Sequence, residues 1–447
     1  MVNNVIIEFM DIFIGVIIGL LVLVALVTVH EFGHFLAARR SGVNVLEFGI
    51  GFPPRAIAWI KDPKTGKWRR LPKSEWKKEK LSKVVYSDTK DKKLAQKGMI
   101  FSLNWLPIGG FCQMDGESAE DERVGTFGKA GFWAKTKILF AGVAMNWLVA
   151  FIIFTVLAWT GMPEFLEGQF TVPVDTVTES TPVEIIKVAE GSPAEQAGIK
   201  EGDRILSVDY NEYTHASEIT DYNEAHMGEK VHYTIQRDET VCLNQPECIV
   251  APCNCLEEKT ESKTFDVDVT LNPEGSEYLL GVSMATTQSL SYSTWSAPIV
   301  GAGLTLQLTG ETFKGVGIML WNLISGVGSQ FSLDAGVRES GQEAISSVGD
   351  SVSGPVGIIG VLFPAFTAAG PTNLAFLAAL ISVSLACMNV LPIPALDGGR
   401  WLLIAIYKLR RKKLTKETEE KIVSRAMIVL LALIFIVTVL DIVRIAN

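Results

Sequence analysis

Four long apolar stretches constrain the fold of this 447-residue chain more than any other feature. Residues 8–38, 136–161 and 426–446 are each long and apolar enough to cross the hydrocarbon core of a bilayer, which takes about 20 residues of helix. A fourth stretch, 373–407, is interrupted by polar and helix-breaking residues: Asn389, Pro392, Pro394 and Asp397. It predicts a spanning helix that is broken near one end. The sequence therefore predicts a polytopic α-helical membrane protein with about four transmembrane helices.

A further region, 290–372, contains an apolar segment of a different kind. The segment is rich in Gly and Thr and carries Glu311 and Lys314. A charged, moderately apolar helix is typical of the membrane interface. We expect an amphipathic or interfacial helix followed by a loop, and not a fifth span.

The distribution of charge predicts the orientation of the spans. Residues 39–97 contain 17 Lys and Arg against 6 Asp and Glu, whereas 162–277 has an excess of acids. Basic loops remain in the cytoplasm, so 39–135 is expected there, and both chain ends and 162–372 on the other side. The lysine-rich part, about 61–97, could bind anionic lipid, or it could be a solvated loop that follows the same rule.

Residues 174–277 are predicted to form an extracytoplasmic domain of the α+β class, rich in β-strands. The segment "VEIIKVAEGSPAEQAGIKEGDRILSVD" (183–209) combines an apolar strand, a short helix from Pro193 and a second alternating strand. It resembles a PDZ domain of the type attached to membrane proteases. Such a domain binds an extended peptide at a sheet edge, although a spacer that binds nothing is the alternative.

Four cysteines are crowded into one part of this domain. Cys242, Cys248, Cys253 and Cys255 lie in 239–262, between two strands, where the segment looks like an insertion. Two disulfides suit an oxidising exterior. A four-cysteine zinc site is the alternative, but the spacing fits no common zinc pattern.

The sequence "HEFGH" (30–34) ends the first apolar stretch. His30 and His34 are four residues apart, so on a helix they share one face and can bind one cation. Glu31 lies next to the first of them, where a carboxylate can accept a proton from metal-bound water. Snorkelling polar residues at a helix end are the alternative, but three ionisable groups at membrane depth would then lack partners.

A catalytic zinc site needs a third protein ligand, and "NVLPIPALDGGR" (389–400) offers one. Asp397 is the only acidic residue between Asp350 and Glu417, and it lies in the broken part of an apolar helix. A carboxylate there is costly unless it is paired or coordinates a metal. A helix-end cap that faces the cytoplasm is the alternative.

Together these motifs resemble the site-2 protease family of intramembrane zinc metalloproteases, specifically its bacterial branch with extracytoplasmic PDZ domains (peptidase family M50). The resemblance implies that His30, His34 and Asp397 hold Zn²⁺ and that Glu31 is the general base. It also implies that "FGIGF" (48–52) and "LPIGGFCQM" (106–114) form a membrane-associated β-hairpin region on the cytoplasmic side.

The same resemblance points to three residues at the substrate: Asn389, Asn146 and Pro392. Asn389 could instead cap the helix before the Pro392 break. Asn146 belongs to a Gly-x-x-x-Asn pattern that begins at Gly142, and its amide could stabilise an oxyanion or orient substrate. Family members usually have proline directly after this glycine, whereas this chain has Val143.

The expected function is zinc-dependent hydrolysis of peptide bonds in or near the transmembrane segments of single-span proteins. Anti-sigma factors and signal-peptide remnants are the implied substrates, in a bacterial cytoplasmic membrane, with the PDZ domain as a size filter. The alternatives are a catalytically silent peptide-binding scaffold and an anchored protease of soluble peptides. The lipid bilayer is a partner, no nucleic acid is expected, and the sequence does not indicate an oligomeric state.

Overall fold

The computed structural model describes most of the chain, in two compact units. The described residues are 2–61, 66–76, 98–117, 123–166, 168–180, 182–213, 216–242, 258–273, 275–276, 278–284, 289–330, 334, 336, 338–342 and 354–446. One unit, here called the helical unit, comprises 1–160, 170–172 and 294–447. The other, here called the β unit, comprises 161–169 and 173–293.

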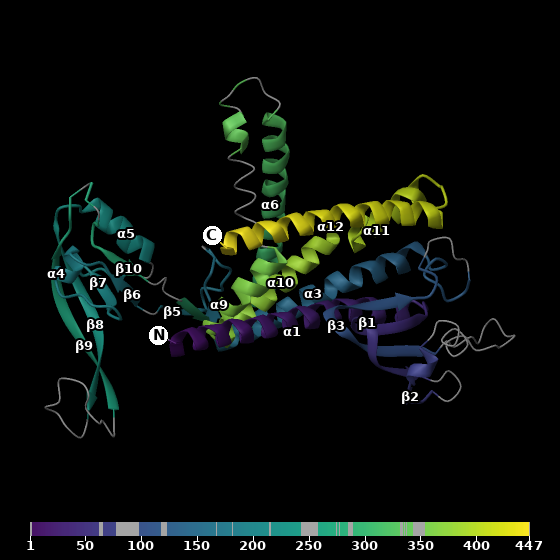
Figure 1. The fold of residues 1–447 in the computed structure, drawn as a ribbon, viewed down its shortest axis with the longest axis horizontal. Helices are drawn as coiled ribbons and strands as arrows, with labels where there is room; N and C mark the ends of the chain where they lie inside the picture. Colours follow the sequence, from purple (N-terminus) through teal and green to yellow (C-terminus); the bar gives the residue numbers. More distant parts are fainter. Residues whose placement is uncertain are drawn as a thin grey trace. The chain divides into compact units, whose positions relative to one another are not determined.

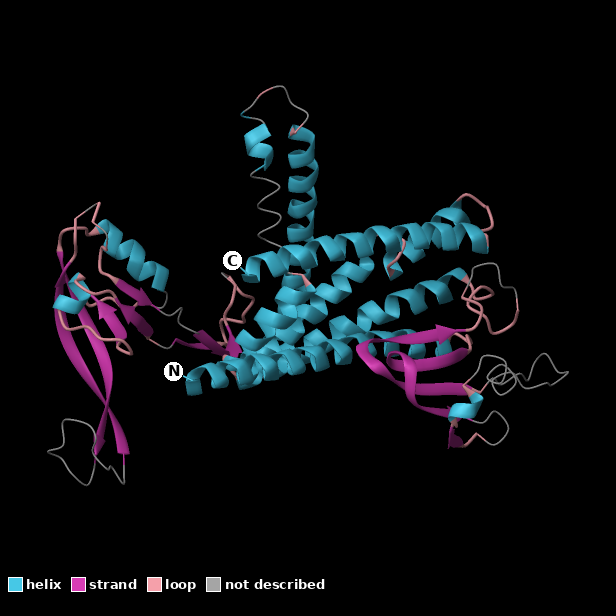
Figure 2. Cartoon of the chain, viewed as in Figure 1, coloured by secondary structure: helices cyan, strands magenta, loops and turns pink. Residues whose placement is uncertain are grey.

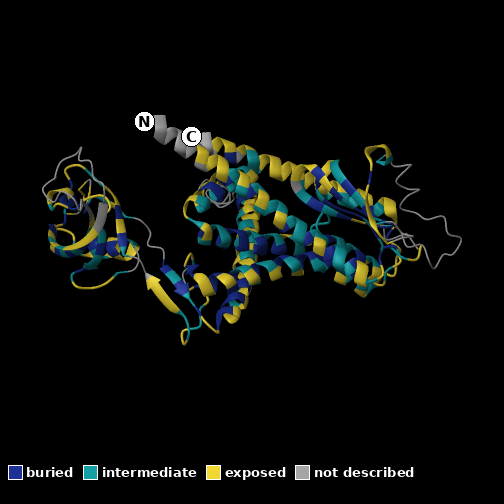
Figure 3. Ribbon diagram, turned by 90° about the horizontal axis from the view of Figure 1, so that it is seen from below, coloured by how far each residue is buried: buried dark blue, intermediate teal, exposed yellow. Residues whose placement is uncertain are grey.

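The helical unit contains the apolar helices that the sequence predicts (Figure 1). Within the described residues, four helices are long and apolar enough to cross a membrane: α1 (Val2–Arg40), α3 (Phe132–Thr160), α10 (Pro371–Val390) and α12 (Lys416–Ala446). Large apolar side chains on these helices face outward, among them Phe13, Leu21, Ile428 and Phe435. In Figure 3 such exposed residues appear in yellow along the helices. An outer surface of this kind is typical of a protein whose solvent is lipid.

The predicted break in 373–407 is a complete interruption. α10 ends at Val390, and a separate helix, α11 (Asp397–Leu409), begins seven residues later. A Cβ atom on Gly398 would collide with the carbonyl of Val390, and one on Gly399 with the carbonyl of Ile393. Because both positions are glycine, the start of α11 can approach the backbone of residues 390–393 closely. Asp397 is the first residue of α11.

A three-stranded antiparallel sheet lies beside α1 in the helical unit, drawn in magenta in Figure 2. Its order is β2-β1-β3, with β1 at Val45–Lys61, β2 at Trp68–Arg70 and β3 at Met99–Met114, and a short helix, η1 (Lys73–Glu75), follows β2. β1 and β3 contain the two segments expected to form a β-hairpin region. The pairing of β1 with β3 extends from Val45 opposite Met114 to Lys61 opposite Met99. Several register shifts interrupt it, and the strands bend at these positions.

A buried charged pair stabilises the bend in this sheet. Glu47 is 3% exposed, and its carboxylate accepts hydrogen bonds from Arg55 Nε at 2.8 Å and from Ser102 Oγ at 2.7 Å. The hydrogen bond from Arg55 to Glu47 raises the pKa of the guanidinium. A buried carboxylate of this kind is tolerated because it is both paired and hydrogen-bonded.

The region 290–372 contains a long helix, α6 (Ala297–Ser329), which crosses the direction of the four apolar helices (Figure 1). Its first half packs against α3, where a Cβ on Gly301 would collide with Thr155. From Gly310 onward most described residues of α6 are at least partly exposed. These features are compatible with the expected interfacial helix.

The chain after Gly354, in the part of 290–372 where a loop is expected, is helical instead. It forms a helical segment: α8 (Pro355–Gly357), a π-helical turn η2 (Ile358–Leu362) and α9 (Phe363–Ala368). The backbone amides of Gly354 and Gly357 donate to the buried carboxylate of Asp441 on α12, at 3.1 and 2.9 Å. These amides begin a helix, and such amides need acceptors, so the Asp441 carboxylate connects two distant segments.

The β unit is built on a five-stranded sheet of order β10-β6-β7-β8-β9. The strands are β6 (Val183–Val188), β7 (Arg204–Val208), β8 (Lys230–Cys242), β9 (Glu258–Thr270) and β10 (Val282–Met284), with helices α4 (Pro193–Gln196) and α5 (Ala216–Ala225). Apolar residues from strands and helices form a single core, which includes Val183, Ile185, Ile205, Ile219, Val231 and Tyr233.

Two features of the β unit differ from the expected boundaries 174–277. β10 pairs with β6, so the sheet extends beyond residue 277. A second small sheet of order β4-β11-β5 pairs β11 (Ser289–Tyr292) with β4 (Met162–Pro163) and with β5 (Val177–Ser180). These long-range pairings carry no periodic signal in the short segments involved.

In the chain, the cysteine-rich segment falls between β8, which ends at Cys242, and β9, which begins at Glu258. Cys248, Cys253 and Cys255 lie outside the described residues, and for Cys242 only the backbone, at the end of β8, is described. The choice between disulfides and a metal therefore stays a prediction.

Candidate metal centre

The histidines of "HEFGH" lie side by side on α1. Both are nearly buried, at 7% exposure for His30 and 6% for His34. Their Nε2 atoms are 3.1 Å apart, and the rings meet edge to face with centroids 4.8 Å apart. This arrangement follows from the helix, which places residues four apart above one another on one face.

Asp397 joins the two histidines from the far end of the chain. Its Oδ2 lies 3.1 Å from His30 Nε2 and 3.2 Å from His34 Nε2. The three atoms thus form a nearly equilateral triangle. In a tetrahedral zinc site with bonds of about 2.0–2.1 Å, neighbouring ligand atoms lie about 3.3–3.4 Å apart. The donor set and its spacing therefore fit one zinc ion with three protein ligands and one open position.

The charges of the cluster also fit a dication. Glu31 forms a metal-capable group with His30 and His34, in which the candidate ligand atoms all lie within 4.8 Å of one another. Together with Asp397 the group has two carboxylates and two imidazoles in a mostly buried place. Two carboxylates at membrane depth are costly without a compensating cation.

Strand β3 lies against Glu31, the candidate general base. The backbone amide of Cys112 faces the Glu31 carboxylate. A Cβ atom on Gly110 would come 3.8 Å from Glu31 Cγ and 3.6 Å from Thr28 Oγ1, so the strand passes directly over this part of α1. Residues 110–114 of β3 pair with β1 on one side only, so among the described strands their other edge has no partner and could pair with an added strand.

Both histidines contact α3 through their other ring nitrogen. His34 Nδ1 donates to the carbonyl of Ile138 at 2.8 Å, which leaves the Nε2 lone pair for a metal. His30 Nδ1 lies 3.4 Å from Nδ2 of Asn146. The sequence pointed to Asn146, but the contact with Ile138 involves a backbone carbonyl and has no sequence signal.

Two glycines allow α1 and α3 to approach this closely. A Cβ on Gly33 would collide with the carbonyl of Ala141. One on Gly142 would lie 2.5 Å from His30 Nε2 and 2.7 Å from His34 Nε2, inside the candidate ligand cluster. The Gly142 of the Gly-x-x-x-Asn pattern therefore leaves room for the cluster, with Val143 in place of the usual proline.

The other predicted substrate residues lie apart from these contacts. The Asn389 side chain donates to the carbonyl of Leu385 at 2.9 Å, one turn earlier on α10. Pro392 is exposed in the segment between α10 and α11. The Asn389 contact resembles the helix-capping alternative, and a role at the substrate stays a prediction for both residues.

A polar cavity reaches the cluster in the helical unit. It has a volume of about 700 Å³, and its lining includes Asp397, Arg400 and Glu419. Arg400 Nε donates to Glu419 Oε1 at 3.1 Å, which joins α11 to the start of α12. The cavity offers water a polar route to Asp397. Sequence reasoning missed Arg400, although it lies three residues after Asp397 in the same motif.

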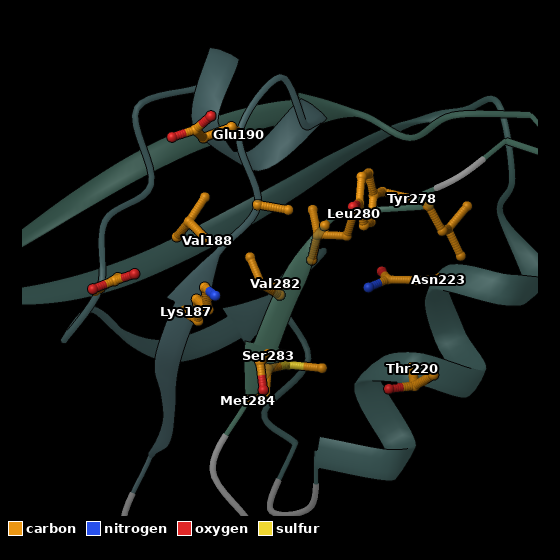
Figure 4. Close-up of a pocket in the computed structure, with 14 residues that line it drawn as sticks. Lys187, Val188, Glu190, Thr220, Asn223, Tyr278, Leu280, Val282, Ser283 and Met284 are labelled. Atoms are coloured by element: carbon orange, nitrogen blue, oxygen red, sulfur yellow. The ribbon is translucent and has the colours of Figure 1, made fainter.

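The β unit has a separate cavity, of about 820 Å³ (Figure 4). It lies between the edge strand β10 and the helix α5. Leu280, Val282 and Met284 come from the segment that ends in β10, and Thr220 and Asn223 from α5. A groove between a sheet edge and a helix can accept an extended peptide.

Comparisons with known proteins identify the family. The model of peptidase family M50 matches residues 18–69 and 91–434. A protein of Clostridium perfringens is 27% identical over 428 residues, which cover 96% of this chain and 98% of that protein. The regulator of sigma-W protease RasP of Bacillus subtilis is 26% identical over 484 residues, covering 97% and 99%. The zinc metalloprotease RasP of Bacillus licheniformis is 25% identical over 477 residues, covering 96% and 99%.

The family match covers every part of the cluster, from α1 to α11. It confirms the resemblance that the motifs suggested. With its His30–Glu31–His34 group and four apolar helices, the chain is a multi-pass membrane metalloprotease and belongs to peptidase family M50.

Proposed function

We propose that this protein is an intramembrane zinc protease that cleaves single-span membrane proteins in or near their transmembrane segments. The observation that carries the proposal is the triangle formed by His30 Nε2, His34 Nε2 and Asp397 Oδ2. Its atoms belong to α1, which is long and apolar enough to cross a membrane, and to α11. The names of the two RasP relatives, a zinc metalloprotease and a regulator of sigma-W, support a role of this kind.

Each group in the cluster has a chemical role in this proposal. His30, His34 and Asp397 hold the zinc ion, which supplies Lewis-acid polarisation of the scissile carbonyl and makes a water molecule nucleophilic at neutral pH. The Glu31 carboxylate accepts a proton from the attacking water and later passes it to the leaving amine. The cavity at Asp397 supplies that water.

The substrate must be extended before it can react. A helix keeps its carbonyls in internal hydrogen bonds, so the scissile segment has to unwind. Pairing with the edge strand β3, which passes over Glu31, would satisfy the freed backbone groups and hold the segment beside the cluster. Asn389 and Pro392 are proposed to contribute to this region.

The β unit is proposed to be a PDZ domain that filters substrates by size. The cavity between β10 and α5 supports peptide binding, and the filter follows from placing this unit on the extracytoplasmic side. The basic residues after α1 and α11 favour that topology in a bacterial cytoplasmic membrane, with both chain ends outside. The start of α1 and the end of α12 lie at the same end of the helical unit, as this requires (Figure 1).

The decisive experiment is the variant Glu31→Gln, purified in detergent with a model single-span substrate. The amide has nearly the same shape but cannot accept the proton, so cleavage should fall by about 10²–10⁴-fold while zinc content stays unchanged. Wild-type cleavage by this variant would refute the mechanism. A zinc-free wild-type protein would refute the metal site itself.

A further inference from the structure

The side chain of Asn146 is in an unusual position for a substrate-binding group. It is 1% exposed, and its amide lies behind His30, against the ring nitrogen that faces away from Asp397. Within the described part of the chain, its Oδ1 is buried and has no hydrogen-bond partner. An amide oxygen without a partner in an apolar site costs free energy unless another state of the protein satisfies it.

Metal binding by His30 would require a state in which the Asn146 oxygen has a hydrogen-bond donor. To bind a metal through Nε2, neutral His30 must carry its proton on Nδ1, and the Nδ1–H group then needs an acceptor. The amide nitrogen of Asn146, 3.4 Å away, cannot accept. A 180° rotation of the amide exchanges its oxygen and nitrogen with little change of shape. The rotated amide would accept from His30 and satisfy Oδ1 in one step.

We propose that Asn146 is a positioning residue whose Oδ1 accepts from His30 Nδ1–H and thereby fixes the tautomer in which His30 binds zinc. This inference rests on the proposed zinc site and gives Asn146 a role through His30, in place of direct contact with an oxyanion. Each histidine would then donate from Nδ1 to an oxygen of α3 and keep its Nε2 lone pair for the metal. The carbonyl of Ile138 is that oxygen for His34, at 2.8 Å.

The surroundings hold Asn146 in place for this role. Ser382 of α10 donates to the backbone carbonyl of Asn146 at 2.8 Å. One turn earlier, Gly142 leaves space for the histidine rings. The backbone of Asn146 is therefore anchored to α10, and the proposed rotation involves only its side-chain amide.

The test compares zinc affinities, measured by competition with a coloured chelator in detergent, for three variants. Asn146→Leu keeps the size but removes the acceptor, and zinc should bind about 10–100-fold more weakly. Asn146→Asp presents an oxygen in either orientation and should bind zinc at least as tightly as wild type. Asn373→Leu removes the amide of another nearly buried asparagine of the helical unit, which donates to the carbonyl of Ala369, and its zinc affinity should match wild type.

Thermal unfolding of the zinc-free proteins shows whether each variant folds. If Asn146→Leu does not fold, Asn146→Ala removes the acceptor with a smaller side chain and takes its place. Wild-type affinity without the acceptor, or equal losses in the Asp and Leu variants, would overturn the inference. A wild-type protein that binds no zinc would overturn the proposed function instead, so the two failures are distinguishable.

Discussion

Asp397 Oδ2 lies 3.1 Å from His30 Nε2, although the two residues are 367 positions apart in the chain. The contact joins the first apolar helix to the first residue of a helix that begins after the break at 391–396. It turns two separate motifs into one cluster.

Removal of the carboxylate should abolish tight zinc binding. In Asp397→Ala the cluster keeps two of three protein ligands, so about one zinc per chain should be lost on dialysis against a mild chelator. Asp441→Asn is the matched control, because Asp441 is also a nearly buried carboxylate of the helical unit but contacts Gly354 and Gly357. Metal analysis of both proteins checks this. Full zinc content in Asp397→Ala would remove Asp397 from the ligand set.

A methyl group at position 142 should disrupt the same site. The added Cβ of Gly142→Ala would lie 2.5 Å from His30 Nε2, so the histidines or α3 must shift and zinc affinity should fall by at least about tenfold. At Gly310 of α6 a Cβ would meet nothing within 4 Å. Gly310→Ala should therefore retain zinc and melt at the same or a slightly higher temperature, since alanine favours a helix by up to about 1 kcal/mol. Equal zinc affinities in the two variants would contradict the close approach of α3 to the histidines.

Removal of the β unit's main sheet should broaden substrate selection. Ser180 of β5 pairs with Ser289 of β11, so residues 182–288 can be replaced by a short turn between neighbouring strands. This shortened protein should cleave full-length substrates that wild type spares, while a pre-trimmed substrate is cut at the wild-type rate. Gel analysis of paired substrates gives the result. Unchanged selectivity with intact activity would rule out the size filter.

The stability of the β unit should depend on one buried ion pair. Asp203 has a fully buried side chain and accepts from Arg237 Nε at 2.6 Å and from another guanidinium nitrogen at 2.7 Å. Arg237→Ala leaves the carboxylate without its cation and should destabilise this unit by about 3–5 kcal/mol. In contrast, Lys230 and Asp268 form an exposed pair, and Lys230→Ala should leave stability nearly unchanged. Pulse proteolysis of the full chain in urea measures the stability of the β unit in both variants. Equal resistance to proteolysis would contradict the expected difference in stability.

Much of this architecture could be predicted because local signals were strong. Long apolar runs dictate spanning helices wherever they occur, since unsatisfied backbone groups are too costly in lipid. The spacing of His30 and His34 places them on one helical face regardless of the rest of the fold. The alternating strands of 183–209 and of the β8–β9 hairpin likewise carry their own periodicity.

Other features have no local signal. The short strands β10 and β11 are recognisable only from their pairing with β6 and β5. The predicted domain boundary at residue 277 therefore excludes both strands. The first amides of the helical segment after Gly354 donate to Asp441, 87 residues later, and no local pattern signals this contact.

The sequence by itself determined which groups could bind a metal, because residue chemistry and helical spacing are local properties. Only the tertiary structure decided that Asp397 completes the triangle, that Gly142 makes room for it, and that Asn146 lies behind His30. Distances of about 3 Å between distant segments depend on helix packing and on the turn at Gly398, and no pattern along the chain encodes them.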